Sequence, residues 1–350
     1  MELVDLLPTV PTDLFDLSRA TLEVVRQTAI PGPHASEWLN DDGENLRLRL
    51  GNHEAPLIKL FPSKTSTPVI GIDTTNIDLG QTQKGVLCAV RGTIVKNKNG
   101  RYEYTRYGPL PFHITNENRQ ILYDNVVESF FGSQEHGAAP PLDKMSEVIR
   151  GLLERWLQHQ VATNNSDTII LWDGSLGAPR VSRSLPLVRM ILEEARNNSN
   201  SVLAFSKKTS LSLWNDSLDL VDSRLAPSLL DVDEEARACA MGQLIFLGHV
   251  YAAKFSPGKY TFRVDIDRSL SSNTAEIGGK LLASESLHEN YPETLRLAHV
   301  LSKFSSVEIV GIHRFIGKTY GFKASPEPNI RRTIFGPLEG NVPPEGVLGY

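Results

Sequence analysis

Three β-type runs that follow one another directly constrain the fold of this chain more than any other feature of its sequence. They are residues 68–79, 85–95 and 101–110, and only the short polar segments GQTQK and KNKNG separate them. Runs of β-forming residues joined in this way are typical of antiparallel neighbours. The sequence therefore predicts a three-strand antiparallel meander.

Helices and apolar strands alternate after the meander. A helical apolar stripe over residues 141–160 leads into a continuous apolar run at 168–176, and a second helix at 184–197 leads into a strand at 201–208. A fully apolar strand indicates burial on both faces, as in the middle of a mixed sheet. The fold class is therefore α/β, of the α+β mixed-sheet kind. The ribonuclease H-like strand order is one known solution, and it places the carboxylate of the first strand beside that of the fourth.

The rest of the chain gives coarser expectations. Residues 1–67 are a helix and an irregular lead-in, 68–325 are the main domain, and 326–350 are an irregular tail. The further expected elements are helices over 11–29, 209–242, 272–286 and 291–305, a hairpin near 245–267, and a last strand or helix at 306–312.

Composition and charge exclude several classes of protein. The chain has 350 residues, with 36 Lys and Arg against 41 Asp and Glu, so its net charge is −5. This acidity argues against a polybasic DNA coat but not against a nucleic-acid enzyme whose positive charge is confined to one groove. Two cysteines, Cys88 and Cys239, make neither a disulfide framework nor a zinc cluster.

Sequence signals for export and for nucleotide binding are both missing. The N-terminus is acidic and contains proline, unlike a secretory signal. The longest apolar stretch, 244–253, is about half the ~20 residues that a bilayer span needs. We therefore expect a cytoplasmic protein. The sequence contains no G-x-x-x-x-G-K-[ST], so any dependence on ATP would have to come from a partner.

Two aspartates close apolar strands. Asp73 lies in VIGIDTTN, and Asp173 ends TIILWD. A carboxylate at the end of a buried run needs a cap, a turn hydrogen bond or a cation to compensate its burial. The common explanation is a turn or cap residue. If the two strands are neighbours, however, the acids present hard oxygen ligands that suit Mg²⁺ or Mn²⁺.

The segment YPETLRLAH contains the sharpest local pattern. Tyr291 and His299 are eight residues apart, slightly over two helical turns, so they share a face. They could be a helix-start tyrosine and a core-edge histidine. Alternatively, His299 is a metal ligand or general acid/base and Tyr291 contacts a phosphate or water. An imidazole beside carboxylates favours Mn²⁺ over Ca²⁺.

Other polar residues have weaker signals. Glu154 and Glu147 lie on one side of the helix before the Asp173 strand, where a solvated helix face is the usual explanation. Lys207 and Lys208 could contact phosphate or could simply be solvated. The segment RYEYTRY could stack and pair with single-stranded nucleic acid, although cross-strand aromatic packing explains it equally well.

Four segments together resemble the NurA family of nucleases. They are GID at 71–73, WDGSL at 172–176, SKKTSL at 206–211 and YPETLRLAH at 291–299, in the family's order across residues 68–312. The resemblance implies a ribonuclease H-like core with added helices and a Mn²⁺-dependent nuclease, with Mg²⁺ as the alternative ion. It implies 5′–3′ exonuclease activity on DNA and endonuclease activity on single strands. It also implies a homodimer that works with a HerA-type hexameric ATPase in DNA-end resection.

The resemblance also assigns roles by position. Asp73 and Asp173 would be metal ligands, His299 a ligand or close neighbour, and Tyr291 a site residue. The family's helix glutamate corresponds to Glu154, with Glu147 as the fallback.

Two other functions compete with this one. A catalytically silent adaptor could dock on the ATPase and only guide DNA, and a ribonuclease H-like enzyme could act on RNA or on branched DNA. A degenerate scaffold is expected to lose at least one of Asp73, Asp173 and His299, and the sequence retains all three.

Overall fold

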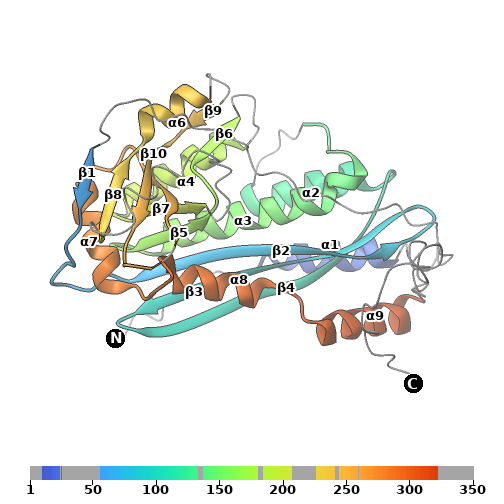
Figure 1. Ribbon diagram of the computed structural model, residues 1–350. Helices are drawn as coiled ribbons and strands as arrows, with labels where there is room; N and C mark the ends of the chain where they lie inside the picture. Colours follow the sequence, from blue (N-terminus) through green and yellow to red (C-terminus); the bar gives the residue numbers. More distant parts are fainter. Residues whose placement is uncertain are drawn as a thin grey trace, which may run out of the picture.

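One large sheet organises the molecule (Figure 1). The computed structural model describes residues 10–23, 25, 56–132, 137–179, 184–206, 226–240, 244–258 and 260–321. Nine strands follow one another across the sheet in the order β1-β8-β10-β11-β7-β5-β2-β3-β4. Their bounds are β1 Leu57–Lys59, β2 Val69–Gln81, β3 Gly85–Lys98, β4 Arg101–Thr115, β5 Ile169–Asp173, β7 Ser201–Ser206, β8 Ser228–Asp231, β10 Gly248–Lys254 and β11 Phe262–Asp267.

The predicted meander is confirmed, and its strands are longer than expected. β2, β3 and β4 span 13, 14 and 15 residues and pair antiparallel in sequence order. β5 lies parallel to β2 on the other side, and β7 lies parallel to β5. In sequence order these five strands form the arrangement 3-2-1-4-5. The mixed-sheet fold class with a ribonuclease H-like core is therefore confirmed.

Four antiparallel strands extend the sheet beyond β7. The expected hairpin near 245–267 is present as β10 and β11. Helical structure over 209–242 was expected, and this is wrong for β8, which pairs with both β10 and β1. Its sequence, SLLD, has little preference of its own, so pairing with distant strands decides its conformation. Within the same range, α6 (Asp233–Cys239) is helical and residues 207–225 lie outside the described part of the chain.

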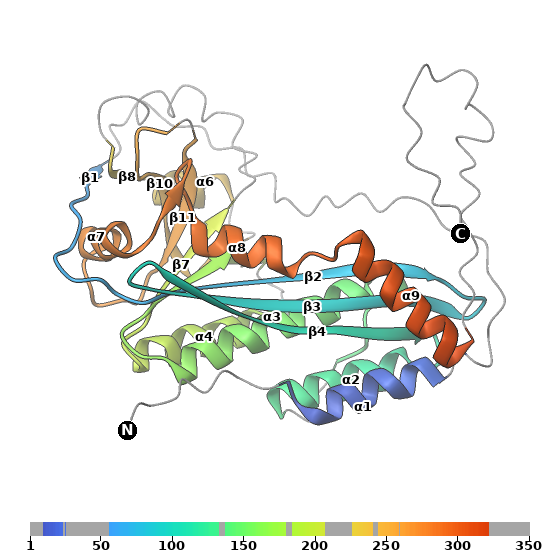
Figure 2. The ribbon, with the colours of Figure 1, turned by 90° about the horizontal axis from the view of Figure 1, so that it is seen from below.

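Helices cover both faces of the sheet (Figure 2). One face carries α3 (Met145–Asn164) and α4 (Leu185–Asn197), with α1 (Thr12–Glu23) and α2 (Arg119–Phe131) beside the end of β4. The other carries α7 (Thr274–Ser284) and α8 (Glu293–Ser302). Residues 306–312, left open between strand and helix, belong to α9 (Ser306–Tyr320). Short pairs complete the fold: β6 (Gly177–Pro179) with β9 (Leu244–Phe246), and β12 (Leu287–His288) with β13 (Tyr291–Pro292).

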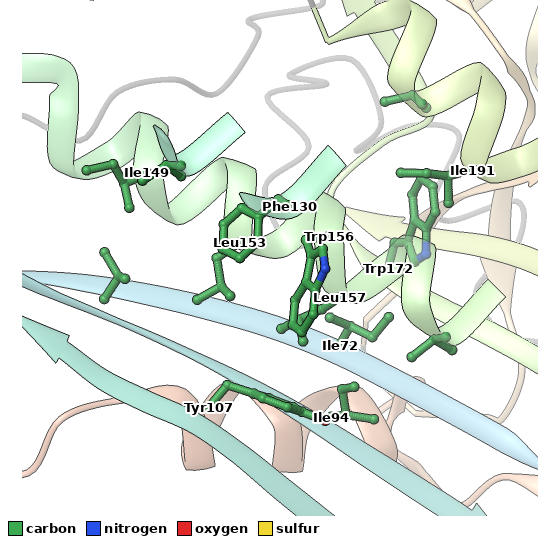
Figure 3. Close-up of a cluster of buried hydrophobic side chains, with 14 of the residues drawn as sticks. Ile72, Ile94, Tyr107, Phe130, Ile149, Leu153, Trp156, Leu157, Trp172 and Ile191 are labelled. Atoms are coloured by element: carbon green, nitrogen blue, oxygen red, sulfur yellow. The ribbon is translucent and has the colours of Figure 1, made fainter. Parts of the chain in front are cut away.

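The core divides into two main layers, one on each face. Figure 3 shows Leu153, Trp156 and Leu157 of α3 packed against side chains of the meander, including Ile72 and Tyr107. Strand residues of opposite parity, such as Val69 and Leu171, pack under α7 and α8. This alternation determines which side chains of β2 and β5 reach each face.

Candidate metal centre

Strand alternation brings the two predicted aspartates to the same face. Ile72 and Trp172 lie opposite each other in the parallel β2–β5 pair, and both point into the core beneath α3. Since successive side chains on a strand point to opposite faces, Asp73 and Asp173 both point toward α8. The two carboxylates thus come from adjacent strands and stand side by side where β5 ends.

A glycine allows α8 to approach these strands closely. A Cβ atom at Gly71 would lie 3.0 Å from the backbone carbonyl carbon, the backbone oxygen and the Cγ2 of Thr294. Most real Cβ contacts are longer than this, so a larger residue at position 71 would require the first turn of α8 to shift by a few tenths of an ångström. The glycine of the GID motif therefore determines how near α8 lies to Asp73.

A buried carboxyl group holds the start of α8. Glu285 accepts hydrogen bonds from the backbone nitrogen of Thr294 at 2.8 Å and from Asn97 Nδ2 on β3 at 3.3 Å. Burial raises the pKa of Glu285 despite the hydrogen bonds that favour its charged form. This contact links the N-terminus of α8 to the sheet, and it was not predicted from the sequence.

α8 adds an imidazole to the two carboxylates. His299 Nδ1 lies 3.0 Å from Asp73 Oδ2. One potential ligand atom from each of Asp73, Asp173 and His299 lies within 4.8 Å of the others. Among the described residues, no other set of three His, Cys, Asp or Glu side chains meets this condition. The Asp73 side chain is 11% exposed and that of His299 is 38% exposed, so the group is open on the histidine side.

Tyr291 is the fourth predicted residue at this position. Its ring packs against Phe205 and Phe262, with centroids 6.1 and 5.2 Å away. Burial, the negative charges of Asp173 and Asp73, and a hydrogen bond with Asp173 all raise the pKa of the Tyr291 phenol. The phenol therefore remains protonated at neutral pH beside the carboxylates of Asp173 and Asp73.

One residue of this group was not predicted from the sequence. Ser302, the last residue of α8, is fully buried, and its hydroxyl donates to Asp73 Oδ2 over 2.8 Å. The signal that could have identified it is its spacing, because it follows His299 by three residues and so lies on the same side of the helix.

Comparison with known proteins identifies a likeness of fold. No protein-family model matches the chain, and no curated protein sequence matches it. The crystal structure of the NurA nuclease from Sulfolobus solfataricus is similar over 77% of this chain and 90% of that one, with a TM-score of 0.50 and 16% identity. The chain has a NurA-like fold. Two further NurA crystal structures, one with manganese, give TM-scores of 0.40 and 0.38 at 10% identity.

The donor set of the NurA-like chain fits a divalent ion. Carboxylate oxygens suit Mg²⁺ and Mn²⁺, and an imidazole among them shifts the preference toward Mn²⁺. Asp73, Asp173 and His299 offer both kinds of donor atom within one small volume. None of the described helices is both long and apolar enough to cross a bilayer.

The structure does not bring the predicted helix glutamates into this group. Glu154 lies on α3, on the opposite face of the sheet, where its carboxylate accepts from Thr74 Oγ1 at 3.2 Å and from Arg150 at 3.0 Å. Glu147, at the start of α3, is 41% exposed and pairs with Lys144. Lys207 and Lys208 lie outside the described residues. A catalytic role for Glu154 therefore stays a prediction.

Proposed function

We propose that this chain is a divalent-metal-dependent nuclease that hydrolyses phosphodiester bonds of DNA at the Asp73–Asp173–His299 group. The observation that carries the proposal is the convergence of three potential ligands, from β2, β5 and α8, within 4.8 Å. If each of the three residues had only a separate structural role, such as a cap or a turn, they would not need to lie close together. Mn²⁺ is the proposed ion, and Mg²⁺ is the alternative.

Each residue of this group would have a different role in the reaction. Asp73 and Asp173 would hold the ion, and His299 would complete its ligands or stand beside it. A bound divalent ion supplies charge stabilisation for the attacking and leaving oxygens and lowers the pKa of water. Tyr291 keeps its proton beside Asp173 and would offer a neutral donor at this edge of the group. The His299 side chain, 38% exposed against 11% for Asp73, would face the side from which a substrate enters.

The resemblance of the motifs to those of the NurA family supports a finer proposal. We infer 5′–3′ exonuclease activity on DNA ends, endonuclease activity on single strands, and a role in DNA-end resection. The partners would be a second copy of this chain, in a homodimer, and a HerA-type hexameric ATPase. Residues 68–325 would form the nuclease domain, with 1–67 and 326–350 as flanking segments in a cytoplasmic protein.

Cleavage and ion binding can be measured separately. The full-length protein is incubated with labelled single-stranded DNA, blunt duplex and RNA–DNA hybrid, in Mn²⁺, Mg²⁺ or EDTA. We expect cleavage of DNA that Asp73→Asn and Asp173→Asn reduce by at least about 100-fold. Electron paramagnetic resonance of free Mn²⁺ should show binding by the unmodified chain and much weaker binding by both variants. Glu154→Gln in the same panel tests the helix glutamate.

A second Asp–His pair provides the matched control. Asp231 on β8 lies 2.8 Å from His249 on β10, and β11, β7 and β5 separate these strands from β2 in the sheet. Asp231→Asn should therefore leave cleavage and Mn²⁺ binding unchanged. Ion binding without cleavage of any substrate would contradict the nuclease and favour the adaptor. Preferential cleavage of the hybrid would favour a ribonuclease H-like enzyme.

A further inference from the structure

The segment RYEYTRY on β4 divides its aromatic residues between the two faces of the sheet. Tyr107 is buried in the core beneath α3, with its ring edge-to-face on Trp156 at 6.1 Å. Tyr104 and Arg106 point to the other face, where Arg106 Nη1 lies 3.3 Å from Glu308 of α9. The Tyr104 ring is 57% exposed, and the Arg106 guanidinium lies 5.8 Å from its centre. Packing thus explains Tyr107 and leaves Tyr104 unexplained.

Arg106 lies in the same row across the sheet as Asp73. It is opposite Thr93 on β3, and Thr93 is opposite Asp73 on β2. Since neighbouring strands are about 4.8 Å apart, the two backbone positions are separated by about 10 Å. A stacked strand rising ~3.4 Å per nucleotide covers that distance in about three nucleotides. The side chains of Asp73, Thr93 and Arg106 are all on the face that carries α8.

The surface between these residues is positively charged. Lys303, directly after Ser302, is exposed, and its backbone oxygen accepts from the buried Arg91 at 3.1 Å. Glu308 is the carboxylate that both Arg91 and Arg106 contact. Arg91 is buried and offsets Glu308, so the exposed Arg106 and Lys303 leave these four residues with two net positive charges on a chain whose net charge is −5. Val300 of α8 is 54% exposed and lies three residues before Lys303, so it is on the same side of the helix.

We propose that a single-stranded DNA segment leading to the Asp73–Asp173–His299 group docks on Tyr104, Arg106, Val300 and Lys303, here called the β4–α8 strip. One base stacks on Tyr104, and the phosphates on either side of it lie against Arg106 and Lys303. An exposed aromatic ring among cations is the combination with which proteins hold single strands regardless of sequence. A duplex keeps its bases stacked inside, so it gains only the contacts with the cations. The choice of DNA as ligand rests on the proposed function, but binding to the strip does not require cleavage.

Binding is tested with the full-length protein in EDTA, which prevents metal-dependent cleavage. Fluorescence anisotropy of a labelled 15-mer of thymidine gives Kd at several NaCl concentrations. We expect Tyr104→Ala to weaken binding about tenfold with an unchanged salt slope. Arg106→Gln and Lys303→Gln should each lower the slope of log K against log salt by about 0.7, the value for one phosphate contact on a single strand.

Two controls come from the opposite side of the sheet. Phe15→Ala removes a 45% exposed aromatic ring on α1, and Arg189→Gln removes an exposed cation on α4. Neither should change Kd by more than twofold. Light scattering of every variant reports the molecular mass, so that a change in self-association is recognised.

The outcomes separate this proposal from the proposed function. If the unmodified chain does not bind the 15-mer, or if the strip variants bind it as the controls do, the strip is overturned. It is also overturned if the strip variants change the mass rather than the affinity, because the strip would then be a contact between copies of the chain. If the strip variants weaken binding while no DNA is cleaved in Mn²⁺, DNA docking on the β4–α8 strip is supported and the proposed nuclease activity is contradicted.

Discussion

At the scale of single residues, the Asp73 carboxylate meets two polar neighbours at one oxygen. Ser302 Oγ lies 2.8 Å from Asp73 Oδ2 and 2.9 Å from the backbone oxygen of His299. A serine hydroxyl has one proton to donate, and a charged carboxylate accepts it more strongly than a neutral carbonyl. The proton therefore goes to Asp73. Together with His299 Nδ1, it fixes the rotation of the carboxylate.

Removing that hydroxyl should weaken ion binding without unfolding the chain. We expect Ser302→Ala to lower Mn²⁺ affinity about tenfold, in the range found when groups that orient metal ligands are removed. Isothermal titration calorimetry measures the affinity, and thermal unfolding without metal measures stability. Ser18→Ala is the matched control, because Ser18 is also buried and its hydroxyl donates to the backbone oxygen of Pro111. Equal Mn²⁺ affinity in both variants would show that Ser302 has only a structural role.

The residues of the metal centre were predictable to different degrees. Asp73 and Asp173 could be predicted because each ends an apolar run, and β strands in register bring such ends together. His299 was selected by its helical spacing from Tyr291, and that reason was wrong, because Tyr291 lies on β13 and α8 begins only at Glu293. Both residues nevertheless lie beside Asp73. Glu154 shows where this reasoning stops. The sequence shows that Glu154 lies on a helix. Which face of the sheet this helix covers depends on how α3 packs on β2, and no local pattern in the sequence encodes that packing.

At the scale of elements, the distance between α8 and β2 depends on Gly71. A Cβ atom there would lie 3.0 Å from three atoms of Thr294, two of them in the backbone. Backbone atoms cannot rotate away as a side chain does, so the helix itself has to move. His299 and Ser302 lie on that helix, and their contacts with Asp73 would change with it.

Gly71→Ala should therefore reduce both stability and ion binding. We expect a loss of about 1–3 kcal/mol in the free energy of unfolding, typical of overpacking, measured by urea denaturation. Mn²⁺ affinity should also fall. Gly92→Ala is the control, since its Cβ would lie 2.4 Å from Leu157 Cδ1 on the α3 face. That variant should lose stability but keep its Mn²⁺ affinity. An unchanged affinity in Gly71→Ala would mean that the spacing of α8 does not determine the geometry of the group.

Long elements were predicted well and short ones were not. The meander, α3 and α8 carry strong periodic patterns, so their type follows from the sequence. β1 and β8 have three and four residues and form a strand pair only because β8 also pairs with β10. α9 was left open because SVEIVGI suits either conformation. The capping box of Ser305 and Glu308 decides for the helix, and Arg91 strengthens that end by binding Glu308.

At the scale of the whole molecule, the candidate centre joins segments that are far apart along the chain. Asp73 contacts His299 and Ser302 across more than 220 residues, and Glu285 ties the same helix to β3. The centre therefore exists only when the sheet has formed and α8 is packed on it. An ion that binds only the folded chain should stabilise the whole of it, by an amount that grows with the logarithm of its concentration.

The stability of the whole chain should also depend on pH through His113. This residue is fully buried on β4 where α1 packs, with Nε2 2.8 Å from Thr82 Oγ1 and its backbone nitrogen donating to Thr21 Oγ1. Burial lowers the pKa of His113 from 6.5 to about 4. Between these two values the unfolded chain binds a proton that the folded chain does not. Stability contributed by the neutral histidine is therefore present above pH 6.5 and is lost as pH falls toward 4.

Replacing His113 by a side chain that does not titrate should remove this dependence. Between pH 7 and 4.5 the unmodified chain should lose about 2 kcal/mol more in the free energy of unfolding than His113→Gln. Glutamine can still bond to Thr82, so the comparison isolates the proton. Buried acids such as Glu285, whose raised pKa acts in the opposite direction, are common to both chains and cancel in the difference. Urea denaturation at each pH gives the two curves. Parallel curves would mean that His113 takes up its proton in the folded chain as easily as in the unfolded one, and that α1 does not seal it from water.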